Sequence, residues 1–292
     1  MKNKKTILVT GGGGFLGKIL TKHLKQVGHK VESYDLIKGQ DLLDRKQLEK
    51  AVQGKDAVFH LAAVADLNIS RKDPFKNMDI NVLGTINIAE ACWKANATLY
   101  FASTCCVYGN QETHPSDEKS LPNPTEIYAC SKLAGENVIL GYAKTCGLEY
   151  NIMRLATFYG PEMRPALAVY VFFDQALHNK PTTIHGDGTQ TRTLTYVDDI
   201  VDGILALFNS GIKNEIVNIT TEEEVSVLDM VKMIKEMTKS KSKITFIPQR
   251  RGQILKEQIL AKKAQRLFGW QAKTSFREGL EKTYEWIKSQ SL

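Results

Sequence analysis

The sequence predicts an α/β protein in which a doubly wound parallel sheet is followed by a smaller C-terminal lobe. Short runs rich in β-branched and other apolar residues alternate with stretches of helical periodicity, as in a sheet built with crossover helices. The alternation weakens after Arg154, where proline and glycine separate shorter elements. The predicted strands of the sheet are residues 6–9, 31–35, 57–61, 99–102, 149–153 and 216–219.

Length and composition suit a globular protein with a large core. The chain has 292 residues, of which 42% are hydrophobic and 24% are charged. We expect residues 1–157 to form the first domain, with residues 195–220 packing back on it. Residues 158–292 are expected to form the smaller lobe.

The charge pattern favours a small anionic partner. The formal net charge is +7, but no nucleic-acid-binding motif accompanies the basic residues, so nucleic acid is not an expected partner. Apolar stretches are too short to span a bilayer, and the one after the basic N-terminus is too short for a signal peptide. We therefore expect a cytoplasmic protein that does not associate with a membrane.

The five cysteines predict neither a disulfide framework nor a metal site. Their number is odd, their spacing matches no metal-binding pattern, and Cys105 and Cys106 are adjacent rather than two residues apart. We expect reduced thiols in a reducing compartment and no bound metal.

The glycine-rich turn between the first predicted strand and helix predicts a dinucleotide-binding site. Residues 10–17 are Thr-Gly-Gly-Gly-Gly-Phe-Leu-Gly. Two spacings fit: G-x-G-x-x-G through Gly12, Gly14 and Gly17, or T-G-x-x-G-x-x-G through Gly11, Gly14 and Gly17. In either register the turn brings backbone N–H groups to a helix N-terminus, where a pyrophosphate can bind.

The ends of the next two strands agree with this interpretation. Asp35 ends the second strand, where a carboxylate can accept hydrogen bonds from the adenosine ribose hydroxyls and would repel a 2′-phosphate. That favours NAD over NADP. Ala62 and Ala63 follow the third strand and are small enough for the cofactor to lie against their backbone. His60 is interpreted as a hydrogen-bonded core histidine rather than a ligand.

A tyrosine and a lysine one helical turn apart predict proton-transfer chemistry. Helices are predicted over residues 80–95 and 127–146, and Tyr128 and Lys132 lie on one face of the second. A nearby ammonium favours the phenolate and lowers the pKa of tyrosine from its usual value near ~10. The phenolate could then take a proton from an alcohol while hydride leaves the carbon. Thr104, at the carboxyl end of a predicted strand, can hydrogen-bond the same oxygen and relay its proton.

With these motifs in place, the chain resembles an extended short-chain dehydrogenase/reductase of the NAD-dependent nucleotide-sugar epimerase/dehydratase family, in particular its UDP-glucose 4-epimerase-like members. The resemblance covers nearly the whole length and implies a Rossmann-type first domain and a nucleotide-sugar-binding lobe. It rests on TGGGGFLG at 10–17, FHLAA at 59–63, NVLGT at 81–85, STCCVYG at 103–109, YACSK at 128–132, RLATFYGP at 154–161, GDGTQTRTLTYVDD at 186–199, PQRRGQ at 248–253 and LFGW at 267–270.

The resemblance also implies which residues bind ligands. The residues expected to contact NAD are Gly11, Gly14, Phe15, Leu16, Gly17, Asp35, Asp41, Leu42, Leu61, Ala62, Ala63, Asn81, Tyr128 and Lys132. Those expected to contact the sugar nucleotide are Thr104, Cys106, Thr157, Arg192 and Arg250. The two arginines would face its diphosphate, which a planar guanidinium can grip through two hydrogen bonds.

Three departures from the family pattern narrow the reaction. The 4,6-dehydratases usually carry Asp-Glu where this chain has Cys105-Cys106, and the decarboxylases usually carry Glu at the position of Cys106. Cys106 also matches the cysteine base of GDP-sugar 3,5-epimerases, although a buried apolar role is the interpretation we favour. Thr157 replaces an asparagine that usually contacts the sugar nucleotide, which leaves the substrate's identity open.

We therefore expect an isomerase, a UDP-hexose 4-epimerase that works through a transient 4-keto sugar with Thr104, Tyr128 and Lys132 as catalytic residues. Alternatives are a nucleotide 4-keto-sugar reductase or 3,5-epimerase, a 4,6-dehydratase or decarboxylase, and a non-catalytic NAD-sensing or RNA-binding module. The family also implies a homodimer formed through the helices predicted at 80–95 and 127–146.

Overall fold

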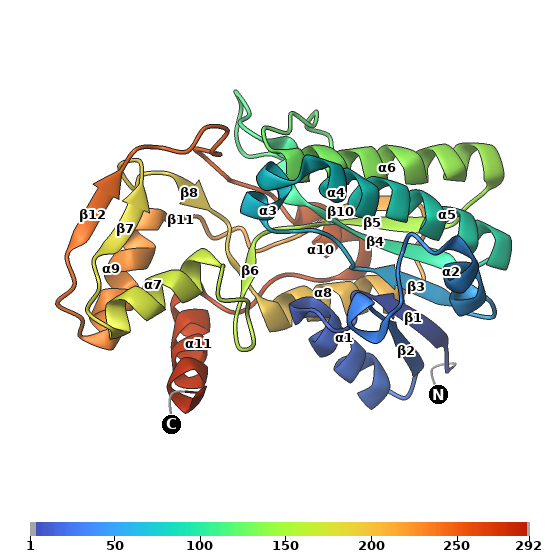
Figure 1. Ribbon diagram of the computed structural model, residues 1–292, viewed down its shortest axis with the longest axis horizontal. Coiled ribbons are helices and arrows are strands. Elements are labelled where there is room, and N and C mark those ends of the chain that lie inside the picture. The colour runs from blue at the N-terminus through green and yellow to red at the C-terminus, as the bar shows by residue number, and fades with distance from the viewer. Residues whose placement is uncertain (1–3, 291–292) are drawn as a thin grey trace. The chain divides into compact units, whose positions relative to one another are not determined.

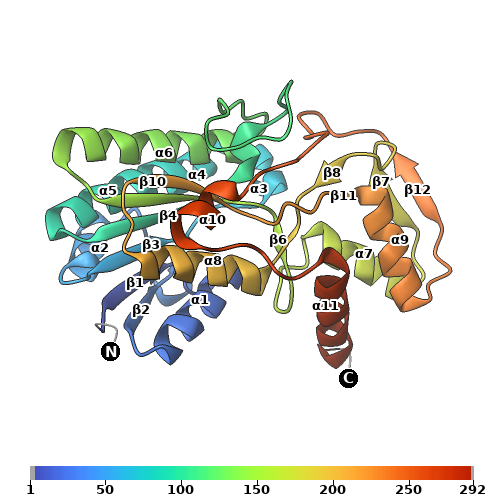
Figure 2. The same cartoon turned by 180° about the vertical axis from the view of Figure 1, so that it is seen from behind.

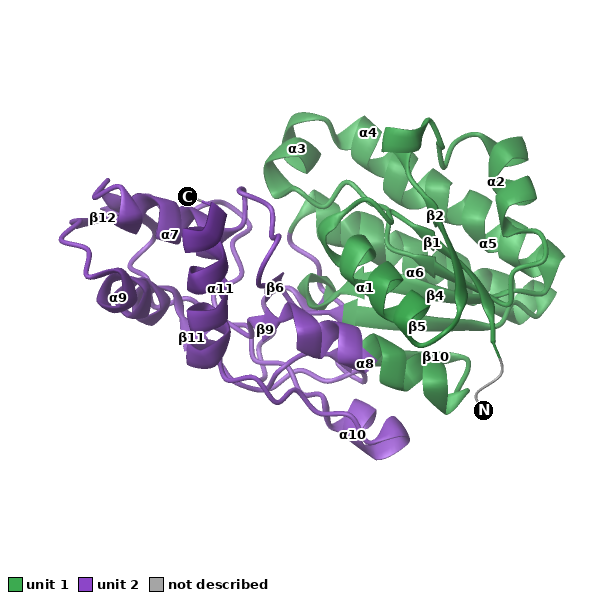
Figure 3. Ribbon diagram, turned by 90° about the horizontal axis from the view of Figure 1, so that it is seen from below, with its two compact units in different colours: residues 1–107, 126–154, 204–217 green, residues 108–125, 155–203, 218–292 purple. Residues whose placement is uncertain are grey.

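The structure is a computed structural model that describes residues 4–290, and these form two compact units (Figure 3). Of the described residues, the first unit comprises 4–107, 126–154 and 204–217, and the second comprises 108–125, 155–203 and 218–290. The segment 108–125 thus belongs to the second unit, although it precedes the expected boundary at residue 157. The expected domains, 1–157 with 195–220 and 158–292, stay a prediction about folding units.

The first unit is built on a six-stranded sheet, which confirms the predicted α/β class. The strand order is β10-β5-β4-β3-β1-β2, and β1 pairs in parallel with both β2 and β3, as β3 does with β4. The strands are β1 (Thr6–Thr10), β2 (Lys30–Tyr34), β3 (Ala57–His60), β4 (Thr98–Thr104), β5 (Tyr150–Leu155) and β10 (Glu215–Ile219). Each overlaps one of the runs that the sequence predicted.

The strand order places a crossover beside β1. The chain goes from β1 outward to β2 and then returns to the other side of β1 to form β3. In open α/β sheets, ligands bind at the carboxyl ends of the strands where the winding direction changes in this way. The glycine-rich turn follows β1 and residues 61–63 follow β3, so both predicted cofactor segments begin at that point.

Helices cover both faces of the sheet, as Figures 1 and 2 show. Helices α2, α5 and α6 lie along one face, and α1 with the C-terminal part of α8 lies along the other. Phe208 of α8 packs edge-on against Phe59 and Tyr100 of the sheet. The helices are α1 (Phe15–Gln26), α2 (Arg45–Val52), α3 (Leu67–Lys72), α4 (Pro74–Met78), α5 (Gly84–Ala95), α6 (Ile127–Cys146) and α8 (Val197–Ser210), with short turns at Leu36–Lys38 and Cys105–Tyr108.

The two helices predicted between the third and fifth strands are both present, with one difference. Helix α6 has the predicted bounds and ends at Gly147, whose left-handed backbone closes it. The helix predicted at 80–95 begins only at Gly84, because residues Asp79–Leu83 form a π-helical turn. Within that turn the Asn81 carbonyl accepts a hydrogen bond from Thr85 Oγ1 at 2.6 Å.

The second unit consists of short strand pairs and helices. Strands β7 (Thr182–His185) and β12 (Ile244–Ile247) pair in parallel, and β8 (Thr191–Arg192) pairs antiparallel with β11 (Val225–Ser226). Strands β6 (Phe158–Tyr159) and β9 (Thr195–Tyr196) form a third, parallel pair. The remaining helices are α7 (Ala168–Leu177), α9 (Val227–Thr238), α10 (Lys262–Phe268) and α11 (Phe276–Gln290). In residues 4–290 no helix is both long and apolar enough to cross a membrane.

Candidate active site

The glycine-rich turn is folded so tightly that an added side chain would clash at several positions. Gly11 has a φ of +69°, and a Cβ there would lie 2.7 Å from the Ala62 nitrogen. A Cβ at Gly17 would lie 2.1 Å from the Gly11 carbonyl oxygen. Gly14 is exposed, and a Cβ there would lie 3.2 Å from the Gly11 oxygen. A Cβ at Gly12 would also clash, 2.2 Å from Ser33 Oγ, so crowding fits both registers. The positive φ of Gly11 favours the register Gly11, Gly14, Gly17, in which the exposed glycine can face a phosphate.

Asp35 connects the end of β2 to this turn. One carboxylate oxygen accepts a hydrogen bond from the Gly13 N–H at 2.8 Å, and the other accepts one from the Ile37 N–H at 3.1 Å. A carboxylate has about four acceptor sites, so it can receive ribose hydroxyls while keeping both contacts. The crowded glycines and this half-buried carboxylate fit the pyrophosphate and adenosine ribose of a dinucleotide.

The other predicted cofactor residues fall into two groups, half-buried residues that a ligand could contact and buried residues that pack inside the protein. Leu61, Ala62 and Ala63 are half-buried after β3, as are Phe15 at the start of α1 and Asp41. The side chains of Leu16 and Leu42 are buried, and Leu42 belongs to the hydrophobic core.

Asn81 is also buried, and its amide is engaged within the protein. Its nitrogen donates to Val64 O at 3.1 Å and to Ser131 Oγ at 2.9 Å, while its oxygen accepts from Val64 N at 2.8 Å. Asn81 therefore ties α6 to the segment that follows β3, which positions the predicted cofactor residues 61–63.

The three predicted catalytic residues all belong to the first unit. Thr104 is the last residue of β4, is buried, and accepts a hydrogen bond from the Cys106 N–H at 3.2 Å. Tyr128 and Lys132 lie one turn apart in the first half of α6, which packs against β4. Tyr128 is half-buried, whereas Lys132 is buried with only 2% of its surface exposed.

Burial makes Lys132 a weakly basic amine. Its Nζ lies 4.6 Å from the centre of the Phe101 ring. Loss of solvent lowers its pKa to about 7, and the nearby Glu136 carboxylate only partly opposes this change. Lys132 can therefore gain or lose its proton near neutral pH, which suits a group that controls the charge of a neighbouring tyrosine.

His60 is a satisfied core histidine, as the sequence analysis expected. Its ring nitrogens lie 2.7 Å from Thr10 Oγ1 and 3.2 Å from Thr85 Oγ1, and its side chain is completely buried. Burial, together with the positive charge of Lys132, lowers its pKa to about 3. The ring therefore stays neutral near pH 7 and cannot act as a cationic acid.

Sequence reasoning missed a buried ion pair between β5 and α6, the helix that carries Tyr128 and Lys132. Arg154 of β5 donates from Nε to Glu136 Oε1 at 3.0 Å and from Nη2 to Glu136 Oε2 at 2.7 Å. The Ser103 hydroxyl also donates to Glu136 Oε1, and both charged side chains are at least 95% buried. Glu136 follows Lys132 by one turn, which was the one clue in the sequence to its place beside the site.

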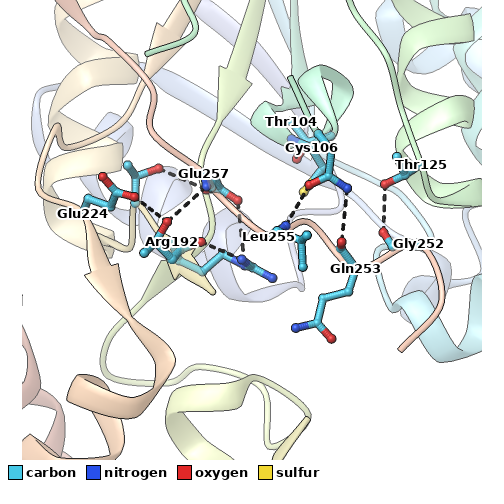
Figure 4. Close-up of polar contacts among 12 residues, drawn as sticks. Thr104, Cys106, Thr125, Arg192, Glu224, Gly252, Gln253, Leu255 and Glu257 are labelled. Atoms are coloured by element: carbon cyan, nitrogen blue, oxygen red, sulfur yellow. Dashed lines mark hydrogen bonds and ion pairs between the residues drawn. The ribbon is translucent and has the colours of Figure 1, made fainter. Parts of the chain in front are cut away.

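The second unit holds the two predicted diphosphate-binding arginines. Arg192 on β8 is partly exposed and donates from Nη1 to the Thr191 carbonyl oxygen at 2.6 Å. Its Nε lies 4.0 Å from Oε2 of Glu257. Figure 4 shows these two side chains next to each other. Arg250 is exposed in the loop after β12, and Thr157 is half-buried, with a carbonyl that accepts from Thr195 N at 3.0 Å. Cys106, the remaining predicted substrate residue, is half-buried in the first unit.

The parallel sheet and its glycine-rich turn define a Rossmann-type dinucleotide-binding protein. The model of the NAD dependent epimerase/dehydratase family matches residues 7–220. The chain belongs to this family, as the motifs indicated.

Known relatives with several activities resemble the chain over almost its whole length. UDP-glucuronic acid decarboxylase 1 of Danio rerio is 32% identical, with 98% of this chain and 73% of that protein covered. The crystal structure of UDP-glucose 4-epimerase from Thermotoga maritima with UDP-glucose has a TM-score of 0.94 and 30% identity, and the likeness covers 98% of this chain and 100% of that one.

A third likeness concerns the cofactor. UDP-glucuronic acid 4-epimerase from Bacillus cereus, solved in complex with UDP-glucuronic acid and NAD, has a TM-score of 0.92 and 32% identity, and the likeness covers 98% of this chain and 99% of that one. The family is NAD-dependent and the glycine-rich turn with Asp35 fits a dinucleotide, so the cofactor is NAD.

Proposed function

We propose that this protein is an NAD-dependent nucleotide-sugar epimerase that inverts C4 of a UDP-hexose through a transient 4-keto sugar. The observation that carries the proposal is the set Thr104, Tyr128 and Lys132, which the NAD-binding unit brings to β4 and to the helix packed on it. The similar solved structures from Thermotoga maritima and Bacillus cereus are epimerases of UDP-sugars, which supports the same class of substrate here.

Each catalytic residue has a role that its surroundings support. Tyr128 takes the proton of the sugar 4-hydroxyl and later returns it, while Thr104 hydrogen-bonds the same oxygen and relays the proton. Lys132 favours the phenolate form of Tyr128 when it is charged. NAD, when bound, supplies a carbon that accepts hydride and gives it back, so that no net oxidation occurs.

The diphosphate of the substrate would be bound by arginines of the second unit. Arg192 has five N–H donors, one of which goes to the Thr191 carbonyl, and its guanidinium can grip phosphate oxygens in pairs. Arg250 is exposed and would add a second positive charge.

Three other reactions of the family are alternatives to this proposal. The Danio rerio relative is a decarboxylase, but this chain has Cys106 where the family's decarboxylases usually carry Glu. A 4-keto-sugar reductase or 3,5-epimerase is favoured by one observation: the Cys106 N–H bonds to Thr104 Oγ1, which brings this cysteine next to a catalytic residue. In that chemistry the thiolate would remove a proton from carbon.

Turnover in heavy water separates these possibilities. The purified protein would be given UDP-glucose, UDP-glucuronic acid and UDP-N-acetylglucosamine in turn, and the products followed by NMR. A 4-epimerase moves hydrogen from carbon as hydride, so its product should carry no deuterium. Deuterium at C3 or C5 would contradict the 4-epimerase assignment, and release of carbon dioxide from UDP-glucuronic acid would identify a decarboxylase.

Two substitutions test the residue roles in the same assay. Tyr128→Phe should lower kcat by ~10²–10⁴-fold, because the proton of the 4-hydroxyl loses its acceptor. Cys106→Ser should leave most turnover intact and is the matched control. The reverse result, with Cys106→Ser inactive and Tyr128→Phe active, would assign the chemistry to the thiol.

The remaining expectations stay predictions. A homodimer and a cytoplasmic location are what the family and the composition favour, and sedimentation at micromolar concentration would test the first. A non-catalytic NAD-sensing or RNA-binding role would require nucleic-acid binding without turnover of any sugar nucleotide.

A further inference from the structure

The second unit contains a buried carboxyl group beside the arginine assigned to the diphosphate. Glu257 lies in the loop between β12 and α10, and only 4% of its surface is exposed. Its Oε1 accepts a hydrogen bond from Thr193 Oγ1 at 3.0 Å, and its Oε2 lies 4.0 Å from Arg192 Nε (Figure 4). Nothing in the sequence motifs gives this residue a role.

The geometry between Glu257 and Arg192 is that of a neighbouring charge rather than a closed ion pair. A separation of 4.0 Å is too long for a hydrogen bond, so the carboxyl group does not occupy the Arg192 N–H groups. The Arg192 side chain also keeps 22% of its surface exposed, whereas that of Glu257 keeps 4%. Arg192 therefore has N–H donors that an anion can reach from solvent, whereas Glu257 is shielded from solvent.

Burial and the charge of Arg192 shift the pKa of Glu257 in opposite directions. Loss of solvent raises its pKa, and this outweighs the lowering by the positive charge of Arg192 and by the hydrogen bonds from Thr193. The other charged groups nearby are Glu224, which accepts a hydrogen bond from Thr191 next to β11, and Lys256, which is exposed and adjacent in the chain. Of these groups, Arg192 is the one whose charge acts on the pKa of Glu257.

An anion bound to Arg192 would favour the protonated form of Glu257 still more. The two phosphates of a nucleotide sugar carry negative charges that repel an ionised Glu257 and compete with it for the same guanidinium. Protonated Glu257 lacks that repulsion and can keep its contact with Thr193. The ligand and the proton therefore favour each other's binding.

We propose that Glu257 couples substrate binding to a proton, so that Arg192 holds the diphosphate tightly when Glu257 is protonated and weakly when it is ionised. This inference rests on the proposed function, because it takes Arg192 as the diphosphate contact. Affinity for the nucleotide sugar is then highest below the pH at which Glu257 ionises, and it falls as the pH rises through that range. No bond to carbon or phosphorus is made or broken, and the proton comes from the solvent.

The test is calorimetric titration of the NAD-bound protein with UDP-glucose and with dTDP-glucose, whose phosphates keep a constant charge over the neutral range. The ligand that binds more tightly is then used for the pH series and the variants. Wild-type affinity should be highest at the lowest pH of the series and should fall about tenfold as the pH rises through the range in which Glu257 ionises. Glu257→Gln, which is always neutral, should bind at every pH as tightly as wild type does at the lowest pH.

A matched control and a measurement without any variant complete the design. Glu224→Gln also replaces a carboxylate by an amide, next to Thr191 rather than Arg192, and it should keep the wild-type pH profile. Titration of the wild type in buffers of different ionisation enthalpy should show proton uptake on binding, and this uptake should vanish in Glu257→Gln.

The possible failures are distinguishable. If neither nucleotide sugar binds the wild type, the proposed function fails. If they bind but the wild type shows neither a pH-dependent affinity nor proton uptake, the inference about Glu257 alone fails. It also fails if Glu257→Gln binds more weakly than the wild type at all pH values, since Glu257 would then only position Arg192.

Discussion

Within residues 4–290, two buried glutamates lie beside arginines, one in each unit, and the two pairs are arranged differently. In the first unit Arg154 and Glu136 are joined by two hydrogen bonds, of 3.0 and 2.7 Å, with both side chains out of solvent. In the second unit Arg192 and Glu257 are separated by 4.0 Å, and the arginine is partly exposed.

The difference shows how to tell a structural charge pair from one that can serve a ligand. Arg154 and Glu136 bond to each other, and Glu136 also accepts from Ser103, so these groups are engaged within the protein and join β5 to α6. Arg192 keeps donors that its neighbour does not take. Only the second arrangement leaves a positive charge ready for an anion.

The largest effect on stability is expected from breaking the hydrogen-bonded pair of Arg154 and Glu136, here called the closed pair. Arg154→Met leaves Glu136 charged and buried without a partner, which should lower the free energy of unfolding by about 3–5 kcal/mol. Urea denaturation followed by circular dichroism would measure it. The double variant Glu136→Leu with Arg154→Met removes both charges and should lose less stability than the single variant. Equal losses in the two would mean that packing, rather than the unpaired charge, sets the cost.

A smaller effect on stability, but a clear effect on ligand binding, is expected at the open pair, Arg192 and Glu257. Arg192→Lys keeps the positive charge but loses the planar fork, so the Kd for the nucleotide sugar should rise about tenfold. The free energy of unfolding should change by less than about 1 kcal/mol, since the arginine is partly exposed. If Arg192→Lys lost stability but kept its affinity, Arg192 would have a structural role like that of Arg154 and would not bind the ligand.

The smallest effect is expected at a surface pair that resembles the closed pair only in its distance. Arg45 Nη2 and Glu90 Oε2 are 2.8 Å apart, but the Arg45 side chain is 59% exposed. Arg45→Ala should change the free energy of unfolding by about 0.2–1 kcal/mol, because water competes for both charges and Glu90 keeps its contact with Lys94. The same urea titration checks this value. A loss comparable to that of Arg154→Met would show that distance matters more than burial.

The sequence was sufficient for the features that depend on local pattern. Helix α6 has the predicted bounds, and the glycine-rich turn and Asp35 follow their predicted strands, because spacing along the chain specifies such elements. The π-helical turn at 79–83 was not predictable, since the Asn81 side chain in it bonds to residues far along the chain.

The buried charges were also outside the reach of sequence analysis. Glu136 and Glu257 look like ordinary surface residues in the sequence, and only packing reveals that they lie out of solvent beside arginines. The pKa of Lys132, about 7, has the same origin, because burial cannot be read from the Y-x-x-x-K motif.

The neutral ring of His60 makes folding of the first unit a reaction that releases protons in acid. An unfolded histidine titrates near ~6.5, whereas the buried His60 has a pKa of about 3. Between these values the unfolded chain holds a proton that the folded chain excludes, so stability falls steadily as the pH drops through this range. Burial of a ring that bonds to Thr10 and Thr85 at neutral pH thus gives the NAD-binding unit a built-in sensitivity to acidification.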